Sequence, residues 1–345
     1  MKRYDCVFVT HLPAFYKVNL YREISRSKRI FVIFIGARGA GRTADFTASD
    51  CGFDSIVMNE GDFESRSWIL SILRLTKTLM GLSYSKICVN GWDLPEFWWI
   101  AILHRRAKNA LALESTIAES AVSGLSGLLK RCFLRRIAMV FASSSGAIRL
   151  LHALRYRGET QVTYGVGLIF KDPKVLSNVR AYTKRFLFLG RLVPEKNLPF
   201  LLEVFRKLPD CRLTLVGDGP ERQALTESAS SNVEFRAHVA NDQLRTVFAE
   251  HDFLVLPSRS ETWGLVVEEA LHHGLPVIVS DRCGASDLIQ DGINGLVVRT
   301  ESHDELVQKI ESITENAFLE MRKHVSENPV ERKDAAQIAA YIRAL

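Results

Sequence analysis

The feature that most constrains this chain is a regular alternation of short apolar runs with longer amphipathic segments. The runs have the length of buried strands, and the segments between them place apolar residues every three or four positions, as helices do. Repeated strand and helix units of this kind build a mostly parallel sheet covered by helices, which is an α/β fold. In the first half this pattern predicts strands over 7–9, 30–35, 55–58, 87–90, 110–113 and 138–142, and helices within 68–79, 98–103 and 125–137.

The alternation is interrupted once, which indicates two domains. Residues 171–184 are polar and punctuated by Pro173, as a linker is. We therefore expect a first domain over 1–170, a second over 185–328, and a C-terminal helix over 329–345 that packs back on the first. Two doubly wound domains bind ligands at the carboxyl ends of their strands, which predicts a site in a cleft between them. The second domain should have strands over 186–189, 213–216, 233–235, 253–256, 276–279 and 295–298, and helices within 198–208, 221–227, 243–250, 264–273 and 304–325.

Composition excludes several classes of protein. Of the 345 residues, 47% are hydrophobic and 24% are charged, which is ordinary for folded domains and excludes a disordered or fibrous chain. The 45 Lys and Arg side chains exceed the 39 Asp and Glu side chains by six. This modest surplus favours phosphates or an anionic membrane surface as partners, and we expect no nucleic-acid partner.

Cysteine placement and hydropathy bear on the compartment. The six cysteines are scattered without a C-x-x-C pair, so we expect reduced thiols in a cytoplasmic protein. No window reaches the roughly 18 uncharged apolar residues that a spanning helix needs, and the first apolar run is too short for a signal peptide. Any membrane contact is therefore expected to be peripheral, on the inner face of the cytoplasmic membrane.

The first strand exit of the second half carries residues suited to an anion. Gly190, Arg191 and Lys196 follow the strand at 186–189 and precede a helix, whose N-terminal N–H groups attract negative charge. A planar guanidinium and a mobile ammonium suit a diphosphate and need no metal. The alternative is a solvated helix start with surface cations.

A second glycine turn follows the next strand. Gly217 and Gly219 have the spacing that begins a dinucleotide fingerprint, but Arg222 stands where the third glycine belongs. We therefore predict a tight strand-to-helix turn, which disfavours a nicotinamide-dependent oxidoreductase.

The strongest signal follows the fourth strand of this second half. Glu261 lies in the loop, and Glu269 lies eight residues on, roughly two helical turns into the next helix. Thr262, Trp263 and Gly264 stand at the helix N-terminus, where backbone N–H groups are presented to an anion. Because Glu269 has apolar neighbours, it should need a polar partner such as sugar hydroxyls. The pattern fits a ligand with a diphosphate between two polyols, and surface acids with an ordinary N-cap are the alternative.

From about residue 185 to residue 298, the chain resembles the donor-binding domain of the retaining glycosyltransferases of family 4, whose fold is GT-B, with two Rossmann-like domains. Glu261 and Glu269 match that family's paired glutamates, and Gly190, Arg191 and Lys196 match its phosphate-binding turn. The resemblance implies a hexosyltransferase that moves a sugar from a nucleotide-diphosphate sugar to a glycan or lipid-linked acceptor. It also implies a role in bacterial cell-surface polysaccharide or glycolipid biosynthesis, with no cofactor.

The same resemblance assigns roles to residues. It implies that Arg191 and Lys196 bind the donor diphosphate, that Glu269 takes the ribose hydroxyls and that Glu261 takes the transferred sugar. Glu261, Arg191 and Lys196 would then form the catalytic set. The identity of the nucleobase stays open, because Ala and His at 237–238 and Trp at 263 depart from the commoner residues. The rest of the donor site would be formed by Gly190, Val239, Thr262, Trp263 and Gly264.

The first half would supply the acceptor side. Residues 11–19 replace the glycine-rich loop that is common after the first strand of this family, so His11, Tyr16 and Asn19 are candidate acceptor residues. Glu114, at a later strand exit, is a fourth. His11 or Glu114 would assist the acceptor hydroxyl, and either also fits a structural loop residue.

No Asp-x-Asp pair occurs in the chain, which removes the usual sequence signal for a metal on the nucleotide diphosphate. We therefore expect a metal-independent reaction in which Arg191, Lys196 and a helix N-terminus stabilise the leaving diphosphate of an oxocarbenium-like transition state. The alternatives on the same plan are a nucleotide-sugar epimerase or phosphorylase, and a catalytically silent sugar-nucleotide-binding subunit.

A basic and aromatic surface is predicted in the first half. Such a surface can rest on an anionic leaflet, where a lipid-linked acceptor would lie. In the alternative, the apolar residues are core and the cations are solvated. The residues concerned are Trp98, Trp99, His104, Arg105 and Arg106 in one segment, and Leu128, Leu129, Lys130, Arg131, Phe133, Leu134, Arg135 and Arg136 in another.

Overall fold

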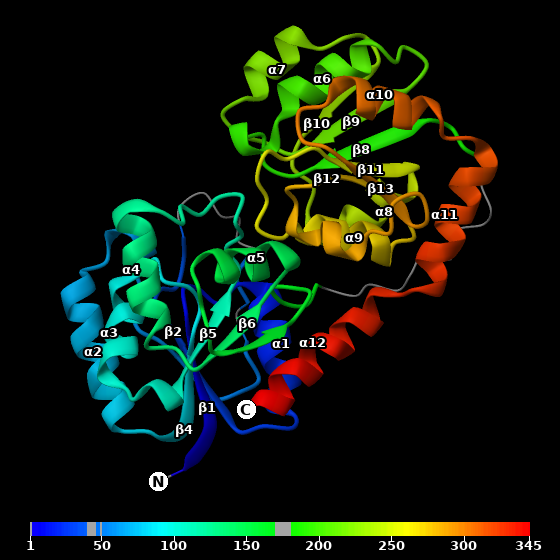
Figure 1. The fold of residues 1–345 in the computed structure, drawn as a ribbon. Helices are drawn as coiled ribbons and strands as arrows, with labels where there is room; N and C mark the ends of the chain where they lie inside the picture. The colour runs from blue at the N-terminus through cyan, green and yellow to red at the C-terminus, as the bar shows by residue number, and fades with distance from the viewer. Residues whose placement is uncertain (1, 40–45, 49, 170–180) are drawn as a thin grey trace. The chain divides into compact units, whose positions relative to one another are not determined.

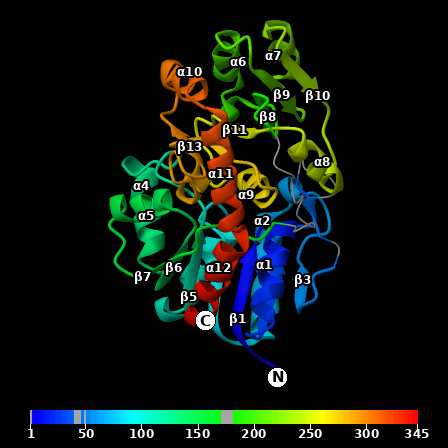
Figure 2. The ribbon, with the colours of Figure 1, turned by 90° about the vertical axis from the view of Figure 1, so that its right-hand side faces the viewer.

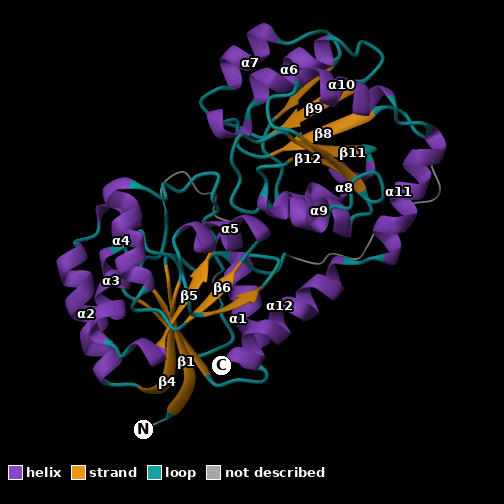
Figure 3. Ribbon diagram, in the orientation of Figure 1, coloured by secondary structure: helices purple, strands orange, loops and turns teal. Residues whose placement is uncertain are grey.

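A computed structural model describes residues 2–39, 46–48, 50–169 and 181–345, and the chain divides into two compact units (Figures 1 and 3). Unit 1 comprises Met1–Phe170 and Lys333–Leu345, and unit 2 comprises Lys171–Arg332. Each unit contains one parallel sheet with helices on its faces, which confirms the expected α/β class. Most of the expected linker, residues 171–180, lies outside the described residues.

Unit 1 contains a seven-stranded sheet in the order β3-β2-β1-β4-β5-β6-β7. The apolar pattern does not predict β7, which is a short edge strand without a fully buried side chain. The strands are β1 (Arg3–Thr10), β2 (Ile30–Phe34), β3 (Ser55–Val57), β4 (Ser83–Val89), β5 (Asn109–Leu113), β6 (Met139–Ala142) and β7 (Glu159–Val162). The helices are α1 (Phe15–Ser25), α2 (Trp68–Met80), α3 (Pro95–Leu103), α4 (Gly124–Leu134), α5 (Ser145–Ala153) and, from Lys333 on, α12 (Val330–Ala344).

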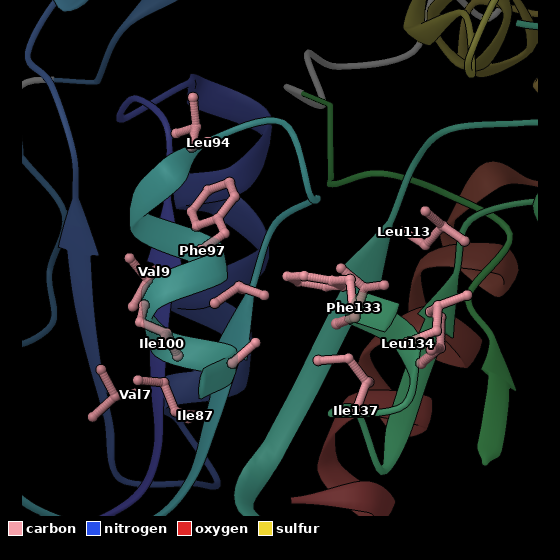
Figure 4. Packing of buried hydrophobic residues seen from close by; sticks show 14 of the residues in the cluster. Val7, Val9, Ile87, Leu94, Phe97, Ile100, Leu113, Phe133, Leu134 and Ile137 are labelled. Atoms are coloured by element: carbon pink, nitrogen blue, oxygen red, sulfur yellow. The ribbon is translucent and has the colours of Figure 1, made fainter. Parts of the chain in front are cut away.

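Helices cover both faces of the unit 1 sheet. One face packs against α2, α3, α4 and α5, with Phe97 and Phe133 in the core (Figure 4). The other face packs against α1 and α12, which lie over the same side of the sheet (Figure 2). There Tyr341 of α12 stacks on Phe141 of β6, with 4.2 Å between ring centroids. The end of the chain is therefore an integral part of unit 1.

Unit 2 contains a six-stranded sheet in the order β10-β9-β8-β11-β12-β13. The pattern predicts one helix over 304–325, but two are present, because the Thr314 side chain caps a new helix by accepting from Ala317 N at 3.2 Å. The strands are β8 (Arg185–Leu189), β9 (Arg212–Val216), β10 (Val233–Arg236), β11 (Phe253–Leu256), β12 (Val277–Ser280) and β13 (Gly295–Val298). The helices are α6 (Leu198–Arg206), α7 (Arg222–Ser228), α8 (Leu244–Ala249), α9 (Leu265–His272), α10 (His303–Glu311) and α11 (Glu315–Glu327).

The direction of strand order reverses at one point in each sheet, between β1 and β4 in unit 1 and between β8 and β11 in unit 2. At such a point the connections after the two strands cross to opposite faces and leave a crevice at the carboxyl ends. Ligands of open α/β sheets bind there. The residues that follow these four strands are therefore the expected functional side chains.

Candidate active site

The turn after β8 packs backbone against backbone on the turn after β9. Leu192 N donates to Asp218 O at 2.9 Å, and a Cβ at Gly217 would lie 1.9 Å from the carbonyl oxygen of Gly190. Only glycine fits at Gly217 without a backbone shift. Arg222, which stands in place of a third fingerprint glycine, donates to Gly217 O at 2.7 Å. The turn after β9 thus supports the turn after β8.

The two cations of the turn after β8 have different surroundings. Arg191 is exposed, and its guanidinium has no hydrogen-bond or ion-pair partner among the residues that the structure describes. Lys196 ends a short 3-10 turn (Pro194–Lys196) and forms a partly buried ion pair with Glu261. Asn197, with a left-handed φ of 58°, then starts α6. One cation faces solvent, and the other already holds a carboxylate.

Glu261 is clamped by backbone hydrogen bonds. Its N–H donates to Arg282 O at 3.2 Å, and its carbonyl oxygen accepts from Gly284 N at 2.9 Å. Gly284 passes so close that a Cβ there would lie 2.1 Å from Thr262 O. Because β8 and β11 are neighbours at the switch point, this fixed carboxylate meets Lys196 from the other strand.

The loop after Glu261 leads into the N-terminus of α9. Gly264 is the N-cap residue, and its φ of 98° favours glycine. The N–H groups of Gly264 and Leu265 have no acceptor within the described ranges. Such N–H groups, together with the helix dipole, attract an anion. This end of α9 is therefore suited to a phosphate, as the sequence predicts for Thr262, Trp263 and Gly264.

The Trp263 side chain does not face a ligand. It is 1% exposed and donates from Nε1 to Glu268 Oε1 at 2.5 Å. Trp263 can therefore reach a ligand only through its backbone, while its indole anchors the loop to α9. Sequence reasoning does not single out Glu268, which is fully buried. The sequence signal that could have identified Glu268 is a second carboxylate directly before Glu269 in an otherwise apolar helix.

Glu269 is partly buried and has no hydrogen-bond partner in the described part of the chain. Burial and, secondly, the charge of Glu268 raise the pKa of Glu269 to about 7. A carboxylate held in this way is stabilised by hydroxyl donors from a ligand. Val239 is half-buried in the loop between β10 and α8, and the adjacent His238 is exposed.

The switch point of unit 1 is lined by polar side chains that pair with one another. His11, after β1, lies with Nε2 2.7 Å from Oδ2 of Asp93, after β4. Lys17 has a side chain only 5% exposed and forms an ion pair with Glu114, after β5. Asn90 Nδ2 also donates to Glu114 Oε1, at 2.9 Å. Sequence reasoning finds His11 and Glu114 but misses Lys17, Asn90 and Asp93, since none of them belongs to a local motif.

Tyr16 and Asn19, expected as acceptor residues in a loop, lie on α1. Asn19 donates to Leu168 O at 3.1 Å and accepts from Arg22 Nη1 at 3.2 Å. A Cβ at Gly167 would lie 2.5 Å from Tyr16 O, so the segment after β7 runs close against this helix. Through these contacts, the Asn19 side chain holds α1 in place.

No group of three or more His, Cys, Asp or Glu side chains that could hold a metal ion occurs within the described ranges. None of the helices described is both long enough and apolar enough to cross a membrane. The absence of a metal requirement stays a prediction.

Unit 2 is similar to proteins of one known family. Residues 177–332 match the family model described as Glycosyl transferases group 1. The sulfoquinovosyl transferase SQD2 of Arabidopsis thaliana is 34% identical over 142 residues, which cover 40% of this chain and 28% of that protein. The lipopolysaccharide core biosynthesis glycosyltransferase LpsE of Rhizobium meliloti is 27% identical over 196 residues, or 55% of this chain and 58% of that protein. The chain thus covers less than two thirds of the length of either relative.

A solved structure shares the fold of the whole chain. Anabaena Alr3699/HepE in complex with UDP and glucose superposes with a TM-score of 0.69 over 99% of this chain and 100% of that chain, at 17% identity. At this identity the similarity concerns the fold alone. The two Rossmann-like units are the GT-B fold that the sequence predicts, and the family match confirms the glycosyltransferase class of unit 2.

Proposed function

We propose that this chain, whose unit 2 belongs to the group 1 glycosyltransferases, transfers a sugar from a nucleotide-diphosphate sugar to a hydroxyl of a glycan or lipid-linked acceptor. One observation carries the proposal. At the β8/β11 switch point, the Lys196–Glu261 ion pair lies where the family resemblance expects diphosphate and sugar to meet. The exposed Arg191 and the N-terminus of α9 follow the same two strands.

The donor half of the proposal follows from the charges. Arg191, Lys196 and the N–H groups at the start of α9 supply positive potential for a diphosphate without a metal. Glu269 would accept the two ribose hydroxyls, and Glu261 would orient a hydroxyl of the transferred sugar. The UDP and glucose in the structure of Alr3699/HepE support a nucleotide-sugar donor for a chain of the same fold.

The chemistry proposed is stabilisation of the leaving group. As the glycosidic bond breaks, negative charge grows on the diphosphate, and groups held in place beforehand stabilise that charge more than they stabilise the ground state. Lys196 is positioned by Glu261, so its ammonium needs little reorganisation. We further propose that the chain is a retaining enzyme of family 4, in which the acceptor attacks from the face of the leaving group.

The acceptor class is proposed from the relatives. LpsE is described as acting in lipopolysaccharide core biosynthesis and SQD2 as a sulfoquinovosyl transferase. These descriptions support a role in cell-surface polysaccharide or glycolipid biosynthesis. In unit 1, the partly exposed Glu114 and the His11–Asp93 pair are the groups available to contact an acceptor hydroxyl.

The test begins with the nucleotide. Thermal shift is measured with UDP, GDP, ADP and dTDP; a ligand at a hundred times its dissociation constant adds about 2.7 kcal/mol to the free energy of unfolding. The matching nucleotide sugars are then incubated with lipid-linked and free glycan acceptors, and the product anomer is assigned by NMR. Sugar transfer with retained configuration supports the proposal. Binding without transfer or donor hydrolysis favours the silent subunit, and an inverted product overturns the retaining assignment.

A further inference from the structure

We infer that the outer surface of α2, α3 and α4 in unit 1 docks on an anionic membrane surface. These three helices form one layer on the same side of the sheet (Figure 1). Trp99 Nε1 donates to Thr76 Oγ1 and so links α3 to α2, while Trp98 packs on Phe133 and so links α3 to α4. The inference goes beyond the proposed sugar transfer, because it requires only this face of unit 1.

Large apolar side chains are exposed along this layer. Trp68 is 53% exposed, Leu73 is 61% exposed and Leu125 is 73% exposed, and Ile69, Leu70 and Leu128 are also more than half exposed. We call these six residues the apolar surface. The alternative that Leu128 and Leu129 belong to the core is therefore wrong. The residues of α4 that pack on the sheet are Phe133 and Leu134.

The apolar surface continues into a cavity between α3 and α4. The residues that line this volume of about 570 Å³ include Trp92, Trp98, Leu125, Leu129 and Lys130. Contiguous exposed apolar surface marks interaction sites in soluble proteins. Aromatic and leucine side chains are the types that enter the boundary between lipid headgroups and acyl chains.

The charge of the layer selects an anionic partner. Segments 66–80, 95–108 and 124–136 contain ten Lys or Arg residues and one acid, Glu96. Glu96 is fully buried and pairs with Arg66, so it contributes no negative charge to the surface. A second copy of this chain would place cations against cations in a symmetric contact, which disfavours a dimer through this face. An anionic lipid surface satisfies both the apolar side chains and the cations.

Some cations of this layer hold the backbone in place, whereas others are available to contact a partner. Lys130 donates to Ala121 O at 2.9 Å, Arg131 donates to Val122 O at 2.9 Å, and Arg136 donates to carbonyl oxygens at the end of α3. Three of the four basic residues predicted near α4 therefore brace the backbone. In these segments, the exposed cations whose side chains have no hydrogen-bond or ion-pair partner among the described residues are Lys77, Arg105 and Arg135.

Vesicle flotation tests the inference without donor or acceptor. The full chain is mixed with phosphatidylcholine vesicles that contain or lack phosphatidylglycerol, and we expect binding to the anionic vesicles alone, weakened by salt. The triple variant K77E/R105E/R135E should lower the partition coefficient by at least about tenfold. The matched control R157E/R212E/K323E, which reverses three exposed cations elsewhere, should leave it nearly unchanged. The variant W68S/L73S/L125S should lower binding and reduce quenching of tryptophan fluorescence by brominated lipid.

Each result has a definite consequence. Equal binding to neutral vesicles, binding to neither kind, or equal losses in the two charge-reversal variants would overturn the inference. A dimer that W68S/L73S/L125S converts to a monomer, with vesicle binding unchanged, would assign the apolar surface to a second copy. Circular dichroism and thermal melting confirm that each variant is folded. Because UDP binding and sugar transfer to a soluble acceptor are measured separately, failure here is distinguishable from failure of the proposed function.

Discussion

The first six strands of each unit follow the same order, but the two switch points carry different residues. In unit 2, the glycine turns allow two loops to pack backbone against backbone, Arg191 faces solvent, and Glu269 lacks a partner among the described residues. In unit 1, polar side chains at the same position pair with one another, as in His11–Asp93 and Lys17–Glu114. These differences are consistent with our proposal that the unit 2 edge binds a charged donor and the unit 1 edge a neutral hydroxyl. The topology determines where in each unit a ligand site lies, and the local residues determine what that site can bind.

Removing Arg191 or Lys196 from unit 2 is expected to have the largest effect and to affect donor use. Lys196→Ala and Arg191→Ala are each expected to lower the donor kcat/KM by about 10- to 150-fold, because a charge-assisted hydrogen bond contributes about 1.5 to 3 kcal/mol. The acceptor KM should change little. Lys207→Ala, which removes an exposed cation paired with Asp304, is the control. Unchanged donor kinetics in both variants would refute the site.

The corresponding change in unit 1 should affect stability instead of donor use. Lys17→Met leaves Glu114 without its cation and should lower the free energy of unfolding by about 2 to 3 kcal/mol. Urea denaturation measures this loss, and Lys17→Met combined with Glu114→Gln should recover most of it. Affinity for the nucleotide should stay unchanged in both. A Lys17→Met protein of normal stability that no longer binds nucleotide would contradict the division of roles.

The buried hydrogen bond between Trp263 and Glu268 offers a more specific test. Trp263→Phe keeps an aromatic ring at this position but removes the indole N–H that donates to Glu268, at a cost of about 1 to 2 kcal/mol. Thermal melting of Trp263→Phe, Glu268→Gln and the double variant gives the coupling between the two side chains. Additive losses would mean that the indole does not anchor the loop through Glu268.

The raised pKa of Glu269 predicts a dependence of stability on pH. With a pKa of about 7 in the folded state against about 4.5 unfolded, the folded chain binds more protons between these values. The contribution of Glu269 is therefore fully present below about pH 4.5 and is lost as the pH rises through about 7. Between pH 5 and pH 8, the free energy of unfolding should fall by about 1 kcal/mol more in the wild type than in Glu269→Gln. This figure is reduced for the partial exposure of the Glu269 side chain. Parallel stability curves for the two proteins would contradict this.

The smallest expected effect is that of a chelator. Because Arg191, Lys196 and a helix N-terminus are proposed to bind the diphosphate, excess EDTA should leave the initial rate unchanged. A rate that falls in EDTA and returns with Mg²⁺ or Mn²⁺ would show that the cations of unit 2 do not suffice.

Periodicity in the sequence predicts most of the fold but misses particular elements. Buried strands such as β6 and β11 are recognisable because every residue in them is apolar or small, whereas the edge strand β7 has no such run. One long amphipathic pattern hides the break at Thr314, because a side-chain cap does not interrupt apolar spacing. Local patterns report which residues are apolar, and they do not report where a helix is capped or a sheet ends.

The sequence by itself determined that this chain forms two parallel α/β units. It also predicted where the candidate functional residues lie, after the strands of the second unit. Tertiary structure alone decided that Lys196 meets Glu261, because that contact depends on β8 pairing with β11. Burial of Trp263 on Glu268 and exposure of Leu128 were likewise decided by packing. The physical reason is that hydrophobic spacing specifies which side chains avoid water, whereas the partner that covers each of them comes from segments far away in the chain.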